Sequence, residues 1–375
     1  MKVLINRTDA IGDTILTLPM ARMIKEKFPD AQVFFMVSKK TADIFRYYPD
    51  VDGIMVMDVN ETWIKRFFKT LKLFIKNKFD TYLFVGGSHI PSYSAWICRV
   101  RYRGGLRSKW QTFFFLNKSV RQKRSIVEMH ETDYNLNLLK PLGINFHYKN
   151  GYKYKPVFTM DKNDSKNAIE LFEAEVKDSS VIFRREIIFI HPGMTGHTLN
   201  WSATNYARLV VCIERQWPEK YLFVLSHTQA DMKYVRKFRN FLDDEKFDFL
   251  KNRIYYFDGG VKGLSNYVTV LDNASLFIGP STGNTHMANA LGVPLVAIYS
   301  PIKVQSAMRW GPYHRDSCKC RVVVPDVVCG EQYECAGERC IYYKCMAKIE
   351  VDDVFQEVRK IFDEKSNVKT EGEEK

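Results

Sequence analysis

The chain has 375 residues, of which 46% are hydrophobic and 26% are charged, and its net charge is +13. This composition excludes a disordered chain because it supplies enough apolar side chains for a core, and the length suits two domains. No apolar run approaches the ~18 residues of a membrane-spanning helix. The apolar segment before Arg7 is too short for a secretion signal, so we expect a cytoplasmic protein.

The first elements are predicted from hydrophobic periodicity. They are a strand at Val3–Asn6, a polar loop at Arg7–Gly12, a helical pattern at Ile15–Phe28 and a strand at Val33–Val37. Pro19 interrupts the helical pattern. Because an interior proline costs a helix roughly 3 kcal/mol, we expect either a kink or a short turn after Asp13 with a new helix start near Pro19.

The basic residues are concentrated in the first part of the chain. Residues 1–150 hold 25 Lys and Arg against 13 Asp and Glu, whereas residues 151–375 hold 31 against 30. Thr62–Arg124 contains 15 basic residues and one acid, Asp80. Such a region attracts phosphates, nucleic acid or anionic lipid headgroups, although it could also be a solvated surface. We find no nucleic-acid-binding module, so we expect no nucleic-acid partner.

Two basic stretches within this region are candidates for binding an acceptor or a membrane. Helical spacing places Lys65, Lys69, Lys72 and Lys76 on one face, with Ile64, Phe67, Leu71 and Phe74 opposite. This pattern is typical of a helix packed on a sheet, and it also suits a helix on anionic lipid. The stretch "RVRYRGGLRSKW" adds cations that suit a phosphate or carboxylate on an acceptor: Arg99, Arg101, Arg103, Arg107 and Lys109.

Further apolar runs predict more strands. They lie at Thr81–Val85, Ile187–Ile190, Tyr221–Leu225, Leu276–Ile278 and Leu295–Tyr299. Strands that alternate with helices indicate parallel sheets with helices on both faces. The polar segment 145–181, with a helical stretch at Ser165–Val176, marks a domain boundary. We therefore predict domains at 1–160 and 161–350, followed by a C-terminal helix and a charged, disordered tail at 351–375.

The loop "GPSTGNTHMANALGVP" at Gly279–Pro294 follows a predicted strand and opens a short helix. In open α/β sheets, ligands bind at the carboxyl ends of the strands, where helix N-termini attract phosphate. Ser281 and Thr282 supply hydroxyls, and Gly283 lets the backbone approach a ligand. The alternative is a capped helix with no ligand, for which a single Ser or Thr would suffice.

This loop resembles the donor-binding loop of glycosyltransferase family 9, the bacterial heptosyltransferases. Two further segments resemble the family in the same order: "INRTDAIGDTILTLPMARMIKEKFPDAQVFFMV" and "IFIHPGMTGHTLNWSATNYARLV". The resemblance is good over residues 1–40, 185–215 and 270–302, and weak over residues 41–184.

The resemblance implies the α/β fold called GT-B, two Rossmann-like domains with parallel sheets facing a central cleft. The basic N-terminal domain would bind the acceptor and the C-terminal domain the nucleotide sugar. It also implies an inverting sugar transfer that needs no metal cofactor. The family's usual donor is ADP-heptose, and its usual acceptor is the inner core of lipopolysaccharide, an anionic glycolipid.

Roles for individual residues follow from the same resemblance. Asp13 matches the catalytic base, although by spacing alone it could merely cap the next helix. The donor diphosphate would be bound by Thr195, Gly196, Ser281, Thr282, Gly283, Asn284, Thr285 and His286. Ser226 and Asp231 are candidates for a nucleoside contact, and Asp231 could equally be a solvated helix acid.

Two positions depart from the family pattern. Many relatives carry Lys or Arg two residues before the tryptophan that is Trp201 here, and this chain has Leu199. The charge of the diphosphate would then be balanced from elsewhere, for which His197 is a candidate. Some relatives carry Asp at the position of Ser281. Both departures bear on which donor is used.

Six cysteines are clustered in the segment 318–345. They are Cys318, Cys320, Cys329, Cys335, Cys340 and Cys345. Disulfides are disfavoured in the cytoplasm, and clustered thiols indicate zinc or iron–sulfur ligation, but the paired CxxC spacing of zinc sites is absent. A structural metal on these cysteines and plain thiols both remain open.

We therefore predict a heptosyltransferase of surface-glycan synthesis, located in the cytoplasm and peripherally on the inner face of the membrane. Three alternatives remain open. The same fold could act on a protein acceptor or use another nucleotide sugar, or the protein could bind a nucleotide sugar without catalysis. A nucleic-acid-binding protein driven by the basic half is a further hypothesis.

Overall fold

The computed structural model describes residues 1–147, 153–194, 196, 198–313, 319–330 and 332–373. The chain divides into two compact units, Met1–Thr159 and Met160–Lys375. Each unit holds a six-stranded sheet, and every strand pairing is parallel. The expectation of parallel sheets in an α/β fold is confirmed.

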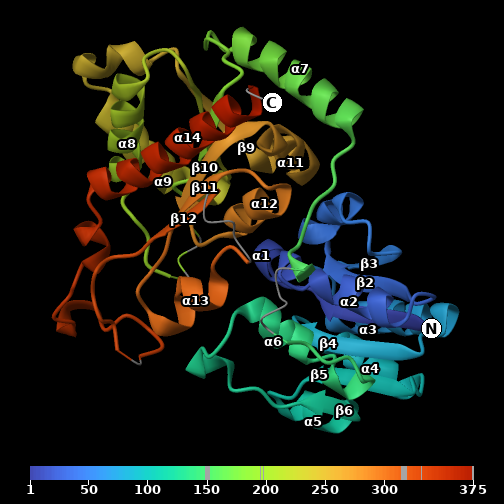
Figure 1. Cartoon of the computed structure of the whole chain (residues 1–375). Helices are drawn as coiled ribbons and strands as arrows, with labels where there is room; N and C mark the ends of the chain where they lie inside the picture. Colours follow the sequence, from blue (N-terminus) through green and yellow to red (C-terminus); the bar gives the residue numbers. More distant parts are fainter. Residues whose placement is uncertain (148–152, 195, 197, 314–318, 331, 374–375) are drawn as a thin grey trace. The chain divides into compact units, whose positions relative to one another are not determined.

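The sheet of the first unit has the strand order β3-β2-β1-β4-β5-β6 (Figure 1). Its strands are β1 (Lys2–Arg7), β2 (Gln32–Ser38), β3 (Gly53–Met57), β4 (Thr81–Gly86), β5 (Tyr102–Leu106) and β6 (Lys118–Val120). Its α-helices are α1 (Ile11–Ile15), α2 (Pro19–Lys27), α3 (Trp63–Asn77), α4 (Ile90–Ile97), α5 (Trp110–Phe115) and α6 (Glu131–Asn137).

One face of this sheet is covered by α3 and α4. Leu4, Tyr82 and Phe84 on the strands pack with Phe74 of α3 and Ile90 of α4 in one hydrophobic cluster. Alternate residues of a strand point to opposite faces, and both faces of the central strands are buried here. Continuous apolar runs are therefore the expected pattern for these strands.

The second unit repeats this arrangement with the order β12-β11-β10-β7-β8-β9. Its strands are β7 (Ile187–Ile190), β8 (Leu222–His227), β9 (Ile254–Asp258), β10 (Ala274–Pro280), β11 (Leu295–Ile298) and β12 (Cys320–Val323). Its α-helices are α7 (Lys162–Asp178), α8 (Ala203–Gln216), α9 (Met232–Leu242), α10 (Gly259–Lys262), α11 (Leu264–Asp272), α12 (Gly283–Leu291), α13 (Ala307–Trp310) and α14 (Val351–Glu373).

Each sheet has one point at which the order of strands reverses. The chain builds outward from its first strand on one side and then returns to build on the other side. The reversal falls between β1 and β4 in the first unit and between β7 and β10 in the second. Ligands of open α/β sheets bind at the carboxyl ends of the strands at such a point. The loops that follow these four strands are therefore the places to look for a site.

The two expectations for Pro19 have a clear outcome. The second is confirmed, because a new helix begins at this residue, with proline in its first turn. The C-terminal helix expected within 351–375 is α14, which runs from Val351 to Glu373. Disorder of the charged tail stays a prediction.

None of the helices in the described part of the chain combines the length and the apolar character needed to cross a bilayer.

Candidate active site

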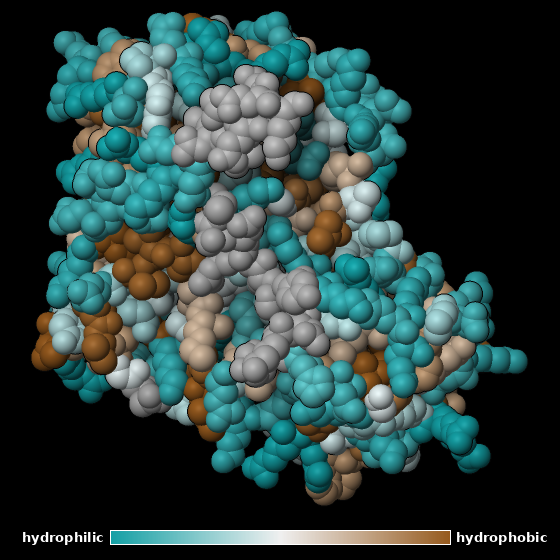
Figure 2. Space-filling model, in the orientation of Figure 1, coloured by the Kyte–Doolittle hydropathy of each residue, from teal (hydrophilic) through white to brown (hydrophobic). Residues whose placement is uncertain are grey.

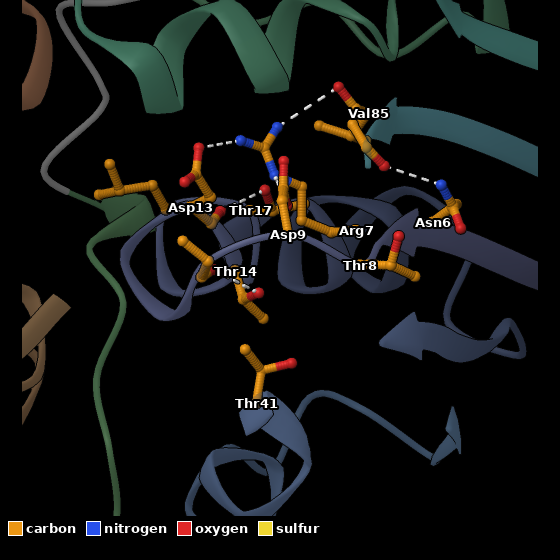
Figure 3. A network of polar contacts seen from close by, with 12 residues as sticks. Asn6, Arg7, Thr8, Asp9, Asp13, Thr14, Thr17, Thr41 and Val85 are labelled. Atoms are coloured by element: carbon orange, nitrogen blue, oxygen red, sulfur yellow. Dashed lines mark hydrogen bonds and ion pairs between the residues drawn. The ribbon is translucent and has the colours of Figure 1, made fainter. Parts of the chain in front are cut away.

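A buried arginine organises the end of β1 in the first unit (Figure 3). Arg7 is only 4% exposed, and its Nε lies 2.8 Å from Asp9 Oδ1. Its Nη2 donates to Asp13 Oδ1, and its Nη1 donates to the carbonyl of Val85 at 3.3 Å. One guanidinium thus contacts two carboxylates and the neighbouring strand β4. With both carboxylates ionised, these three residues carry one net negative charge.

Asp13 lies in the first turn of α1 but does not cap it. The N-cap position is Ala10, which makes no side-chain capping bond, and the Asp13 side chain turns to Arg7 instead. The Asp13 side chain keeps 24% of its surface exposed. The capping alternative is therefore not what the structure shows, and a carboxylate stands at the switch point with access to solvent.

Burial and the neighbouring charges shift the pKa values of Arg7 and Asp9. Burial works against the charge of Arg7, but the Asp13 and Asp9 carboxylates outweigh it and raise the pKa of the guanidinium further. Burial also raises the pKa of the Asp9 carboxyl above its usual value, against the opposing effect of Arg7. Arg7 therefore stays protonated at neutral pH.

The loop after β4 closes against this cluster. Asn6 donates to the carbonyls of Gly86 at 2.8 Å and Ser88 at 3.1 Å, and the Ser88 N–H donates to Thr8 Oγ1 at 2.8 Å. A Cβ on Gly86 would lie 2.8 Å from Arg7 Nη1. Glycine at this position is therefore required by the space that the arginine occupies.

A second buried ion pair joins Arg124, in the short 3₁₀ turn Arg124–Ile126, to Glu131 at the start of α6. Arg124 donates to Glu131 and, at 3.1 Å, to Asn135 Oδ1. Asn135 donates in turn to the carbonyl of Leu16 at 3.2 Å, just after α1. This chain of hydrogen bonds connects α6 to the end of α1 and so supports the position of Asp13.

The sequence analysis did not predict a role for Arg7, Arg124 or Glu131. The only feature of the sequence that could have indicated Arg7 is a charged residue at the end of an apolar strand.

In the second unit, the loop after β10 leaves polar atoms without protein partners. The Thr285 hydroxyl donates to the carbonyl of Pro280 at 2.6 Å, which fixes the turn into α12. Thr282 is the N-cap residue but makes no capping bond. Its Oγ1 is buried, and so is Nδ1 of His286, and neither has a hydrogen-bond partner among the described residues. Such atoms at a helix N-terminus suit an anionic ligand.

The remaining predicted members of this loop lie in the same turn. Ser281, Gly283 and Asn284 are half-buried, and His286 is 4% exposed. Burial lowers the pKa of His286 to about 4, so its imidazole is neutral at pH 7. Gly292 ends α12 in the left-handed region with φ of 77°, which glycine adopts readily.

The loop after β7 is held by residues expected to touch the nucleoside. Ser226 is 1% exposed and its Oγ lies 3.1 Å from His191 Nδ1. Asp231 accepts from the Thr228 N–H at 2.9 Å and from its hydroxyl at 2.8 Å. A Cβ on Gly193 would lie 2.2 Å from Asp231 Oδ1. Ser226 and Asp231 thus have protein partners that position this loop, and their nucleoside contact stays a prediction.

Two residues proposed for this loop, Thr195 and His197, lie outside the described residues. Gly196 is exposed, and its φ of 86° is in the left-handed region that favours glycine. Leu199 is partly buried against the hydrophobic core of the second unit. The indole of Trp201 is 1% exposed and donates to the carbonyl of Ile349 at 2.9 Å. Leu199 is thus an apolar residue that also packs against apolar neighbours.

The basic residues proposed for the acceptor differ in their surroundings. Arg99, Arg101, Arg107 and Lys109 are exposed. Arg103 instead donates through Nε to the carbonyl of Phe115 at 2.9 Å and through Nη1 to that of Val100 at 2.6 Å. Arg103 therefore holds α5 to the sheet, and four of the five side chains remain open to a ligand.

The cysteine segment borders a cavity of about 530 Å³. Four cysteines line it: Cys329, Cys335, Cys340 and Cys345. Figure 2 shows hydrophobic surface at the left edge of the view, over the part of the chain that is orange-red in Figure 1.

Within the described ranges, which omit Cys318, no three Cys, His, Asp or Glu side chains are grouped to hold one ion. A structural metal on the cysteines stays a prediction that elemental analysis would test. None of the residues predicted to bind the donor lines this cavity.

Comparison with known proteins decides the family. The profile of glycosyltransferase family 9 (heptosyltransferase) matches residues 65–335. The chain belongs to glycosyltransferase family 9. It is therefore a glycosyltransferase, as its sequence predicts. A presumed glycosyltransferase of Haemophilus influenzae is 24% identical over 314 residues, which cover 83% of this chain and 86% of the relative. The lipopolysaccharide core heptosyltransferase OpsX of the same organism is 21% identical, with coverage of 82% and 80%.

Solved structures show the same fold. The ADP-heptose lipopolysaccharide heptosyltransferase II of E. coli has a TM-score of 0.72 and 18% identity, covering 97% of this chain and 100% of its own. E. coli heptosyltransferase WaaC with ADP has a TM-score of 0.62 and 16% identity, covering 96% and 100%. These likenesses give this family 9 member the GT-B fold.

Proposed function

We propose that the protein transfers heptose from ADP-heptose to a hydroxyl of a lipopolysaccharide core or related surface glycan, with inversion at the anomeric carbon. The family assignment and the named activities of its relatives support heptose transfer to lipopolysaccharide. The name of the E. coli ADP-heptose lipopolysaccharide heptosyltransferase II, which shares the fold, supports ADP-heptose as the donor. The observation that carries the proposal is the carboxylate of Asp13, held by Arg7 at the switch point of the first sheet.

In this mechanism, Asp13 accepts the proton of the acceptor hydroxyl. The hydroxyl oxygen forms a bond to the anomeric carbon, and the bond from that carbon to the diphosphate breaks on the opposite side. The electron pair leaves with ADP. Because Arg7 is shared between Asp13 and Asp9, the cluster keeps net negative charge and can take up a proton. Asp9 and Arg7 are positioning residues for this step.

The departing diphosphate is stabilised by the N-terminus of α12. Free N–H groups and the helix dipole favour negative charge there, and Thr282 and His286 offer polar atoms that have no partner in the described structure. The segment Ser281–His286 contains no carboxylate, which is the side chain that Mg²⁺ prefers. We therefore propose transfer that needs no metal ion.

The apolar Leu199 favours a second candidate, a protein that binds a nucleotide sugar without transferring it. A transfer assay separates the two. The full chain is incubated with labelled ADP-heptose and a lipopolysaccharide-precursor extract, alongside Asp13→Asn and the exposed-surface control Asp30→Asn. We expect Asp13→Asn to bind ADP normally and to lose roughly 100-fold or more in transfer rate. Binding of ADP-heptose with no transfer by the wild type would favour the second candidate.

A further inference from the structure

The exposed Trp and Phe side chains of the described chain are concentrated on three helices of the first unit. Seven Trp and Phe side chains are exposed, and six of them belong to this region. The six are Trp63 and Phe68 on α3, Trp96 on α4, and Trp110, Phe113 and Phe114 on α5; the seventh is Phe249. Each of the six is more than half exposed, so this surface keeps a large apolar area in water.

Helix α3 has three faces rather than the two that its sequence predicts. Phe74 and Thr70 are buried against the sheet. Ile64, Phe68 and Ile75 are 62–63% exposed, and their spacing of four and seven residues aligns them in one stripe. The expectation that Ile64 packs on the buried side is therefore wrong. A row of exposed lysines runs beside the apolar stripe: Lys65, Lys69, Lys72 and Lys76.

Contacts between aromatic rings join the three helices into one surface. The ring of Tyr93 on α4 lies 6.3 Å from that of Trp63 on α3 and 4.7 Å from that of Phe115 on α5. Trp96 packs edge-on against Phe115 at 5.6 Å. The Arg107 guanidinium lies over the ring of Phe113 at 4.3 Å. Aromatic and cationic groups are thus presented together.

We infer that the surface of α3, α4 and α5 binds an anionic phospholipid bilayer. Its aromatic and aliphatic side chains would enter the interfacial layer while Lys and Arg contact lipid phosphates. The charge favours this partner, since Thr62–Arg124 holds 15 basic residues and one acid. A second copy of the chain that docked with the same surface would bring the same positive charge and be repelled. The inference does not depend on the proposed transfer chemistry.

Vesicle co-sedimentation of the full chain tests this inference. The probes are vesicles of phosphatidylcholine alone and vesicles with about one third phosphatidylglycerol. The first variant, Trp110→Ser/Phe113→Ser/Phe114→Ser, removes the apolar tip of α5, and the second, Lys72→Gln/Lys76→Gln, removes charge from α3. A matched control, Leu171→Ser/Val261→Ser, changes side chains of the second unit that are 73% and 80% exposed.

We expect the wild type to bind the anionic vesicles at least 10-fold more tightly than the neutral ones, with a blue shift of tryptophan emission. The aromatic variant should bind them at least 10-fold more weakly and the lysine variant several-fold more weakly, with circular dichroism unchanged. Equal loss in the control would overturn the inference, as would no vesicle binding by the wild type. A dimer in light scattering that only the aromatic variant disrupts, without vesicle binding, would assign the surface to a second copy instead.

Discussion

Arg7 and Asp13 form an ion pair across the loop that follows the first strand, and Arg7 is the buried partner. Its side chain is 5% exposed, whereas that of Asp13 is 24% exposed. Moving the arginine out of the cluster would therefore leave the negative charge of the two carboxylates without a cation beside it. The Asp13 carboxylate, by contrast, is exposed enough to contact a ligand. This asymmetry fits a fixed cation that orients a working carboxylate.

Replacing Arg7 tests this arrangement. Arg7→Met should destabilise the protein, towards the low end of the roughly 3–5 kcal/mol measured for broken buried pairs because both carboxylates are partly exposed. Transfer should fall because Asp13 would lose the side chain that orients it. Arg7→Lys should restore part of both. A wild-type transfer rate in a folded Arg7→Met protein would show that Arg7 does not position the base.

The close approach of Gly86, at the end of β4, to Arg7 and Asp9 predicts the effect of adding one methyl group at this glycine. Gly86→Ala would place a Cβ 2.8 Å from Arg7 Nη1 and 2.9 Å from Asp9 Oδ2. We expect the arginine to be displaced, lowering both transfer and the midpoint of thermal unfolding. Gly259→Ala is the matched control, since its Cβ would meet no atom closer than 3.5 Å. Equal effects of the two changes would argue against a special role for Gly86.

Substitutions of Thr282 and Thr285, at the start of α12, should affect ligand binding and folding separately. The Thr282 hydroxyl has no partner in the described structure, whereas that of Thr285 donates to Pro280. Thr282→Val should weaken ADP binding about 10-fold, the loss expected from one hydrogen bond to a charged group, with stability retained. Thr285→Val should lower stability by about 1 kcal/mol. Calorimetric titration and thermal unfolding read the two effects, and normal ADP binding by Thr282→Val would remove this hydroxyl from the donor site.

The buried His286 predicts a pH dependence of folding. Its folded pKa of about 4 lies below the ordinary value of 6.5, so the unfolded chain binds more protons between these limits. Stability should therefore fall as pH drops from 6.5 to 4, by at most roughly 3 kcal/mol from this group. Burial also lowers the pKa of His191, which adds to the same trend. His286→Gln should flatten the slope in denaturant unfolding at several pH values. A slope equal to the wild type would refute the assignment.

The sequence predicts the central strands well and the sheet margins poorly. The strands β1, β2, β4, β7, β8, β10 and β11 carry continuous apolar runs because both of their faces are buried. The four edge strands β3, β6, β9 and β12 were not predicted, nor was β5, whose sequence is YRGGL. The edge strands β3, β6 and β12 bury less of their surface, so their sequences show weaker periodicity.

The candidate site was predicted only where a local motif carries it. Asp13 and the loop Ser281–His286 follow from family motifs, and the structure places them at the two switch points. The partnership of Arg7 with Asp13, and that of Ser226 with His191, depend on contacts made only in the folded chain. No sequence pattern shows that a polar side chain already has a partner from a distant strand.

The most direct test of the account is thermal unfolding of the full chain with ADP, UDP, GDP and ADP-heptose. A ligand at 100 times its dissociation constant should add roughly 2.7 kcal/mol to the free energy of unfolding. We predict stabilisation by ADP and ADP-heptose but not by UDP or GDP, and a smaller shift for Thr282→Val. Stabilisation by UDP or GDP alone would show that the donor carries that nucleotide instead of ADP. No shift with any of the four would contradict a nucleotide-sugar site at α12.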